Sequence, residues 1–142
     1  MKTIHHVCDI EATPEAVWAA LTTERGLASW WSTKVSAPPA AVGSVIRFTF
    51  RGDFNPEMRI EELEPDKRLV WRCVGGHENW ANGTFEFRLT PGEESGTRLR
   101  FWQYYAVELA DDYYGTYNFN WGYYLESLSE FCSQGKGTPF EA

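Results

Sequence analysis

Hydrophobic and polar residues alternate in a series of short segments along the chain. In the segment 44–50, Ile46 and Phe48 alternate with Arg47 and Thr49. The strand-like segments are 3–10, 44–50, 57–63, 67–74, 83–90 and 97–105. Successive side chains of a strand point to opposite faces. These segments therefore predict an antiparallel sheet with one apolar, aromatic-rich face and one charged, solvated face.

Two short helices are expected after the first strand. Thr13 is a good N-cap, Pro14 suits the first helical position, and Glu15 favours the positive end of the helix dipole. A second short helix is expected from Glu24 to about Trp31, weakened by its internal glycine.

A long amphipathic helix is expected near the C-terminus, from about Gly115 to Gln134. Trp121, Leu125 and Leu128 fall on one helical stripe. Gly135 follows the last turn, where glycine commonly ends a helix. The apolar face of the sheet is the one surface large enough to bury this stripe. The predicted fold is thus α+β: a curved antiparallel sheet of six to seven strands wrapped around the long helix, in a single domain spanning residues 1–142.

The charge and composition of the chain limit the classes of binding partner. The chain has 142 residues, 16% of them aromatic, and a formal net charge of −7. An acidic surface repels phosphate backbones and anionic lipid, so neither nucleic acid nor membrane is an expected partner. The first ten residues alternate and carry Asp9, unlike a signal peptide. A cytoplasmic location is expected, with Cys8, Cys73 and Cys132 as reduced, buried thiols.

Motifs spread over nearly the whole chain resemble those of a known superfamily. They lie in residues 12–22 with 27–31, 59–71, 96–99, 121–128 and 135–140. As a set they resemble the START/SRPBCC superfamily, whose fold is the helix-grip fold, and within it the branch of activator homologues of the heat-shock-protein-90 ATPase. The resemblance implies the fold. It does not imply one function, because this superfamily includes lipid carriers, metabolite binders, cyclases and chaperone regulators.

Recognisable catalytic and metal-binding motifs are missing from the sequence. There is no glycine-rich phosphate loop and no Gly-x-Ser-x-Gly elbow. His5 and His6 are adjacent in a strand, so their rings point to opposite faces and do not share a metal in the usual way. His77 lies in a glycine-rich loop and is expected to be solvated. No metal and no cofactor are therefore expected.

The candidate site is the inward face of the sheet and the start of the long helix. His6 and Gln103 are polar residues on inward-facing positions, where they either pair locally or orient a bound molecule. The tyrosines and tryptophans around the helix either fill the core or line a cavity. The candidate ligand-binding residues are His6, Trp30, Trp31, Phe48, Phe50, Met58, Trp71, Phe85, Phe87, Phe101, Gln103, Tyr105, Tyr117, Trp121 and Tyr124.

Three functions remain open. The favoured hypothesis is a module that binds a small hydrophobic molecule, aromatic or lipid-like, in a cavity between sheet and helix. The second is an enzyme of the cyclase or hydratase kind, with His6 as the candidate catalytic acid–base. The third, implied by the resemblance alone, is a chaperone partner. A homodimer, formed through a sheet edge or through outward-facing Trp102 and Tyr104, is compatible with each.

Overall fold

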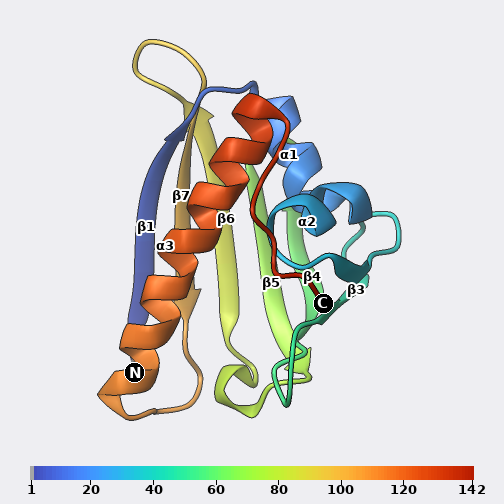
Figure 1. The fold of residues 1–142 in the computed structure, drawn as a ribbon, viewed down its shortest axis with the longest axis vertical. Helices are drawn as coiled ribbons and strands as arrows, with labels where there is room; N and C mark the ends of the chain where they lie inside the picture. Colours follow the sequence, from blue (N-terminus) through green and yellow to red (C-terminus); the bar gives the residue numbers. More distant parts are fainter. Residues whose placement is uncertain (1) are drawn as a thin grey trace.

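The computed structural model describes residues 2–142 and shows one curved antiparallel sheet with three α-helices against it (Figure 1). The strand order is β1-β7-β6-β5-β4-β3-β2, and all neighbours are antiparallel. The elements in chain order are β1 (Thr3–Ile10), α1 (Pro14–Thr22), α2 (Glu24–Trp30), β2 (Lys34–Ser36), β3 (Val45–Thr49), β4 (Glu57–Glu64), β5 (Arg68–Gly75), the short 3₁₀ helix η1 (Glu78–Trp80), β6 (Thr84–Pro91), β7 (Thr97–Tyr104) and α3 (Asp111–Gln134).

The predicted helix-grip fold is confirmed. Helix α3 runs obliquely across the sheet, with α1 and α2 beside its C-terminal half (Figure 1). The structure adds the short edge strand β2, and α3 begins at Asp111 rather than at about Gly115. The earlier start is favoured because Asp111 and Asp112 place negative charge in the first turn of the helix.

Two predicted helix ends are confirmed: the start of α1 at Thr13 and Pro14, and the end of α3 at Gly135. The Thr13 side chain accepts a hydrogen bond from Ala16 N at 3.2 Å, and Pro14 opens α1. Thr23 caps α2 in the same way. Gly135, in the left-handed conformation, follows the last residue of α3. Among residues 2–142, no helix combines the length and apolar character needed to cross a bilayer.

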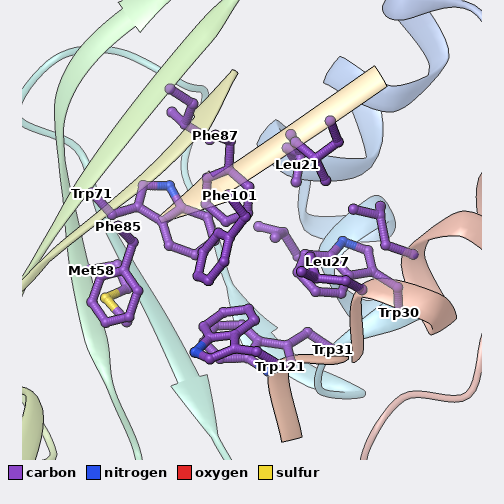
Figure 2. Packing of buried hydrophobic residues seen from close by; sticks show 14 of the residues in the cluster. Leu21, Leu27, Trp30, Trp31, Met58, Trp71, Phe85, Phe87, Phe101 and Trp121 are labelled. Atoms are coloured by element: carbon purple, nitrogen blue, oxygen red, sulfur yellow. The ribbon is translucent and has the colours of Figure 1, made fainter. Parts of the chain in front are cut away.

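Large aromatic side chains fill the space between the sheet and the helices. Phe85, Phe87 and Phe101 project from β6 and β7, and Trp71 projects from β5 (Figure 2). Leu21, Leu27 and Trp30 meet them from α1 and α2, and all seven side chains are buried. The centre of the fold is therefore packed core. Space for a ligand must be sought towards its ends.

The outer face of the sheet carries a lattice of ion pairs. Glu61 accepts hydrogen bonds from Arg59 at 3.0 Å and Arg72 at 2.7 Å, and these bonds lower the pKa of Glu61 to about 2. On the next strands, Glu86 pairs with both Arg68 and Arg88. Charged pairs between neighbouring strands stabilise their alignment and keep this face solvated.

One aromatic residue on the outer face, Trp102, is covered by its neighbours. The His5 ring stacks on Trp102 with 4.7 Å between centroids, and the Arg88 guanidinium lies 5.1 Å from the Trp102 ring centroid. Trp102 is half-buried as a result. It offers less apolar surface to a second molecule than its outward position in the sequence indicated.

Candidate functional site

An aromatic pocket of about 270 Å³ lies beside α3, between the turn after β3 and the C-terminal tail. Eight of its ten lining residues are aromatic, and the other two are Arg51 and Asn120. The aromatic members are Trp31, Phe50, Phe54, Trp80, Tyr117, Trp121, Tyr124 and Phe140. They come from the end of α2, the turn after β3, η1, α3 and the tail.

Three nearly parallel indoles form one wall of the pocket. Trp31 lies 5.1 Å from Trp121 and 6.3 Å from Trp80, and Trp80 lies 6.1 Å from Trp121, measured between ring centroids. Their interplanar angles are 28°, 16° and 16°. Trp31 and Trp121 are shown among the core residues in Figure 2. This wall presents a broad apolar surface of fixed orientation, because its indoles are held by the core behind them.

The turn after β3 supplies a second wall. Phe50 and Phe54 pack against each other at 4.7 Å, and Phe54 meets Trp80 edge-on at 4.9 Å. A backbone hydrogen bond from Phe54 N to Arg51 O closes the turn. The Arg51 guanidinium then lies 4.9 Å from the Phe140 ring centroid, a cation–π arrangement at the rim of the pocket.

The C-terminal tail completes the pocket by returning along Ser32. Phe140 N donates to Trp31 O at 2.8 Å, and Thr33 N donates to Phe140 O at 2.9 Å. The tail approaches α3 closely at Gly137, where an added Cβ would lie 2.8 Å from Ser127 O. Only glycine fits there, so Gly137 is needed to place Phe140 over the pocket.

A polar cluster surrounds the hydroxyl group of Tyr117, which lines the pocket. The Tyr117 hydroxyl lies 2.7 Å from His77 Nε2 and accepts from Asn79 Nδ2 at 2.9 Å. His77 Nδ1 faces the Asp53 carbonyl oxygen at 3.4 Å. When Nδ1 donates to this carbonyl, Nε2 is the acceptor of the ring and Tyr117 donates to it. Burial raises the pKa of Tyr117, with the Asn79 bond opposing it.

His77 is therefore not the solvated loop residue that the sequence indicated. Its ring is half-buried and packs edge-on against Phe54 at 4.8 Å, Trp80 at 5.6 Å and Tyr117 at 5.8 Å. The chain turns back after β5, and this brings His77 beside the turn after β3.

Two further polar atoms lie beneath this part of the pocket. Trp80 Nε1 and the Tyr105 hydroxyl are buried and have no hydrogen-bond partner among the described residues. Burial raises the pKa of Tyr105, although the nearby Trp80 indole opposes that rise. The two groups lie close together but outside hydrogen-bond geometry. An unpaired buried polar group costs about 1–3 kcal/mol, so this region is not optimised for stability.

The structure brings five of the candidate ligand-binding residues into the pocket: Trp31, Phe50, Tyr117, Trp121 and Tyr124. Nine others are buried in the core and do not line it: Trp30, Phe48, Met58, Trp71, Phe85, Phe87, Phe101, Gln103 and Tyr105. Gln103 pairs locally, since its Oε1 accepts from Trp121 Nε1 at 2.8 Å.

His6 is placed away from the pocket. Its Nε2 lies 2.9 Å from Asn118 Oδ1 on α3, and its Cε1 faces the backbone of Gly122. It is half-buried between β1 and the helix. Within residues 2–142, no three His, Cys, Asp or Glu side chains gather closely enough to hold a metal ion.

Sequence reasoning did not single out the other half of the pocket. Phe54 and Trp80 lie in connections between strands, Phe140 lies in the tail, and Arg51 and Asn120 are exposed. The one signal shared by Phe54, Trp80 and Phe140 is that each is a large aromatic residue outside the alternating segments. Such residues have no strand or helix stripe to explain their burial.

Comparison with known proteins settles the family. A family model described as activator of Hsp90 ATPase homolog 1-like protein matches residues 11–133. The chain belongs to this family. The fold is similar to the solution structure of the Aha1 dimer from Colwellia psychrerythraea, with a TM-score of 0.85 and 34% identity over 96% of this chain and 100% of that one.

Two further solved structures share the fold alone. A crystal structure of a protein from Mesorhizobium loti has a TM-score of 0.77 at 24% identity, covering 91% of this chain and 95% of that one. A putative protein of the dynemicin biosynthetic locus has a TM-score of 0.79 at 21% identity, covering 96% of this chain and 49% of that one. No curated protein matches.

Proposed function

We propose that this protein binds a small hydrophobic molecule, aromatic in character, in the pocket beside α3. One observation carries the proposal: eight aromatic side chains surround a space of about 270 Å³, with two polar residues at its rim. Ligand sites are typically concave, mostly apolar and furnished with a few polar groups that fix orientation. The helix-grip fold is compatible with this use.

The pocket size limits the ligand. Pockets for drug-sized molecules measure roughly 300–1,000 Å³, and this one lies just below that range at about 270 Å³. A molecule of one or two fused rings matches the volume. A long lipid chain does not, so the aromatic alternative is favoured over the lipid-like one.

Native mass spectrometry of the freshly purified protein is the first test, because a retained ligand appears as a stoichiometric added mass. The second test is a titration with 2-naphthol, a neutral two-ring probe, in which binding is monitored by tryptophan fluorescence. We expect saturable quenching, because Trp31, Trp80 and Trp121 line the pocket. An unliganded mass together with no saturable response to 2-naphthol or a broader set of one- and two-ring compounds would overturn the proposal.

A matched pair of variants locates the binding. Asn120 and Asn118 are both exposed on α3, but only Asn120 lines the pocket. Asn120→Trp places a large ring at the rim and should weaken 2-naphthol binding at least tenfold. Asn118→Trp adds the same ring beside His6 and should leave binding unchanged. Equal effects of the two substitutions would place the probe elsewhere.

For an enzyme of the cyclase or hydratase kind, the arrangement favours a group other than His6. His6 contacts Asn118 rather than the pocket, whereas the Tyr117 hydroxyl is paired with His77 at the pocket wall. A tyrosine whose proton points at a histidine is a suitable acid–base pair. If a substrate is found, Tyr117→Phe should abolish turnover and retain binding, while His6→Ala should retain both.

We also propose that the protein forms a homodimer through the outer face of α3. Phe119 is 76% exposed and Tyr123 is 52% exposed, one helical turn apart on that face. Large exposed aromatic residues often mark an interaction surface. The structure from Colwellia psychrerythraea, 34% identical, is described as a dimer, which favours a second copy as the occupant.

Sedimentation equilibrium tests the dimer. We expect a concentration-dependent dimer for the parent protein and a monomer for the double variant Phe119→Ser, Tyr123→Ser. Tyr104→Ser removes an aromatic group that is 41% exposed on β7 and should leave the dimer intact. A monomer at every concentration would refute self-association. The aromatic face of α3 would then be available to a different protein. Adding this protein to a chaperone and measuring the chaperone's ATPase rate would test that partner.

A further inference from the structure

The cation at the pocket rim, Arg51, has no carboxylate partner among residues 2–142. On the sheet, six arginines form ion pairs with carboxylates: Arg47, Arg59, Arg68, Arg72, Arg88 and Arg98. Arg51 makes no ion pair and no side-chain hydrogen bond with any residue in the range 2–142. The Arg51 guanidinium carbon instead lies over the Phe140 ring, 4.9 Å from the ring centroid.

The turn that carries Arg51 separates two charges. Arg51 lies on the side of Phe140 and Tyr124, since its charge opposes the rise that burial causes in the Tyr124 pKa. Asp53 lies on the other side, where its carbonyl faces His77 and its negative charge raises the Tyr117 pKa. The pocket therefore has a cationic group at Arg51, and hydrogen-bonding groups with the negative charge of Asp53 nearby at Tyr117.

A guanidinium at the rim of the pocket can bind an anionic group of a ligand. It presents several N–H donors in a planar fork that matches a carboxylate, and stacking on Phe140 limits its freedom, so less entropy is lost on binding. The protein as a whole has a formal net charge of −7, and among residues 2–142 Arg51 is the one cationic residue that lines the aromatic pocket.

We propose that the ligand is an aromatic acid, with its ring against the indole wall and its anionic group at Arg51. This inference rests on the proposed function, since it names the ligand class of that same pocket. Arg51 is then the residue that selects anionic over neutral aromatic molecules. The ring supplies the apolar contact in either case, and the charge supplies the preference.

Two compounds with the same ring test the charge alone. 2-Naphthoate is ionised at pH 7.5, because carboxylic acids of this kind titrate near pH 4, and 2-naphthamide is neutral. We expect the parent protein to bind 2-naphthoate about tenfold more tightly than 2-naphthamide by calorimetry. The preference should shrink as salt is raised, because Arg51 is exposed and its charge is screened.

Variants assign the preference to Arg51. Arg51→Gln should bring the two affinities together while the affinity for 2-naphthamide stays as in the parent protein. Arg47→Gln removes an exposed arginine outside the pocket lining and should leave the preference intact. Arg51→Lys should retain part of it, because a lysine keeps the charge without the planar fork.

The outcomes separate this inference from the function on which it rests. If neither compound binds, and 2-naphthol does not bind either, the pocket proposal fails. If 2-naphthamide and 2-naphthoate bind equally to the parent protein, the pocket proposal stands and the aromatic-acid inference is refuted. A preference that survives Arg51→Gln also refutes it, because another cation would then be responsible.

Discussion

The Trp121 indole donates a hydrogen bond to Gln103 Oε1 at 2.8 Å and thereby joins α3 to β7 in the buried interior. This bond orients one indole of the pocket wall. The nitrogen of the same side-chain amide, Gln103 Nε2, is buried and has no hydrogen-bond partner among the described residues. Gln103→Leu therefore removes one unpaired group while it creates another at Trp121, and its net effect alone is small.

A double-mutant cycle isolates the value of this bond. Urea unfolding measures the loss of unfolding free energy in Gln103→Leu, in Trp121→Phe and in the double variant. We expect the sum of the two single losses to exceed the loss in the double variant by about 1 kcal/mol, because each single change leaves the other side chain without its hydrogen-bond partner. Additive effects within error would show that the bond contributes nothing to orienting the helix.

The second prediction concerns acid sensitivity. The pKa of Glu61 is lowered to about 2 by Arg59 and Arg72. In the unfolded chain the pKa is near 4.3. Its contribution to stability is therefore complete above about pH 5 and is lost as the pH falls towards 2. Glu61→Gln should lower the melting temperature at pH 7 and flatten its decline between pH 5 and pH 2.

Glu64→Gln is the matched control for this experiment. Glu64 is exposed at the end of the same strand and makes no ion pair within residues 2–142. Its replacement should leave the pH profile unchanged. If Glu61→Gln declines as steeply as the parent protein, other carboxylates, such as Glu86 between Arg68 and Arg88, account for the acid sensitivity.

The third prediction concerns the tail. At Gly137 an added Cβ would lie 2.6 Å from Ser29 O and 2.8 Å from Ser127 O, so the backbone must shift. Gly137→Ala should destabilise the protein by about 1–3 kcal/mol, and it should weaken 2-naphthol binding by displacing Phe140. Urea unfolding and the fluorescence titration measure the two effects.

Gly122→Ala provides the comparison, because Gly122 lies inside α3 and its new Cβ would meet only His6 Cε1 at 3.6 Å. We expect it to stabilise the helix by roughly 0.5–1 kcal/mol and to leave binding unaltered. A Gly137→Ala protein as stable as the parent would mean that the tail can lift without cost, contrary to the packing described above.

The fourth prediction concerns the three thiols. Cys73 is buried as predicted, whereas Cys8 and Cys132 are only half-buried. Burial raises the pKa of Cys8 to about 12, of Cys132 to about 11, and raises that of Cys73 as well. The thiolate is the reactive form. At pH 8, the folded protein should react slowly with a disulfide reagent such as dithiobisnitrobenzoate, and all three thiols should react at once in urea. Rapid reaction of one equivalent of thiol in the folded protein would contradict this prediction.

The sheet was accessible to sequence reasoning because its pattern is local. Each long strand carries enough alternating positions to show which side faces inwards, as in β7, where Leu99, Phe101 and Gln103 are all buried. Strand β2 has only three residues and is defined by its pairing with β3, so no comparable alternating pattern marks it.

Only half of the pocket residues could be predicted from the sequence, for a different reason. An aromatic residue such as Phe87 and one such as Trp121 both belong on an inward face, but sequence does not say which of them borders empty space. That depends on how Arg51, Phe54 and Phe140 fold back over the edge of the core. Such long-range placement is set by tight turns and by the close approach at Gly137.

Half of the pocket wall belongs to segments that contribute little to the sheet. The turn at residues 50–54, Trp80 in η1 and Phe140 in the tail can vary without altering a single central strand. Under the proposed function, family members can therefore diverge in what they recognise while keeping the same scaffold. Ligand choice would then be an evolvable property of short connecting segments, and redesign of specificity should begin there.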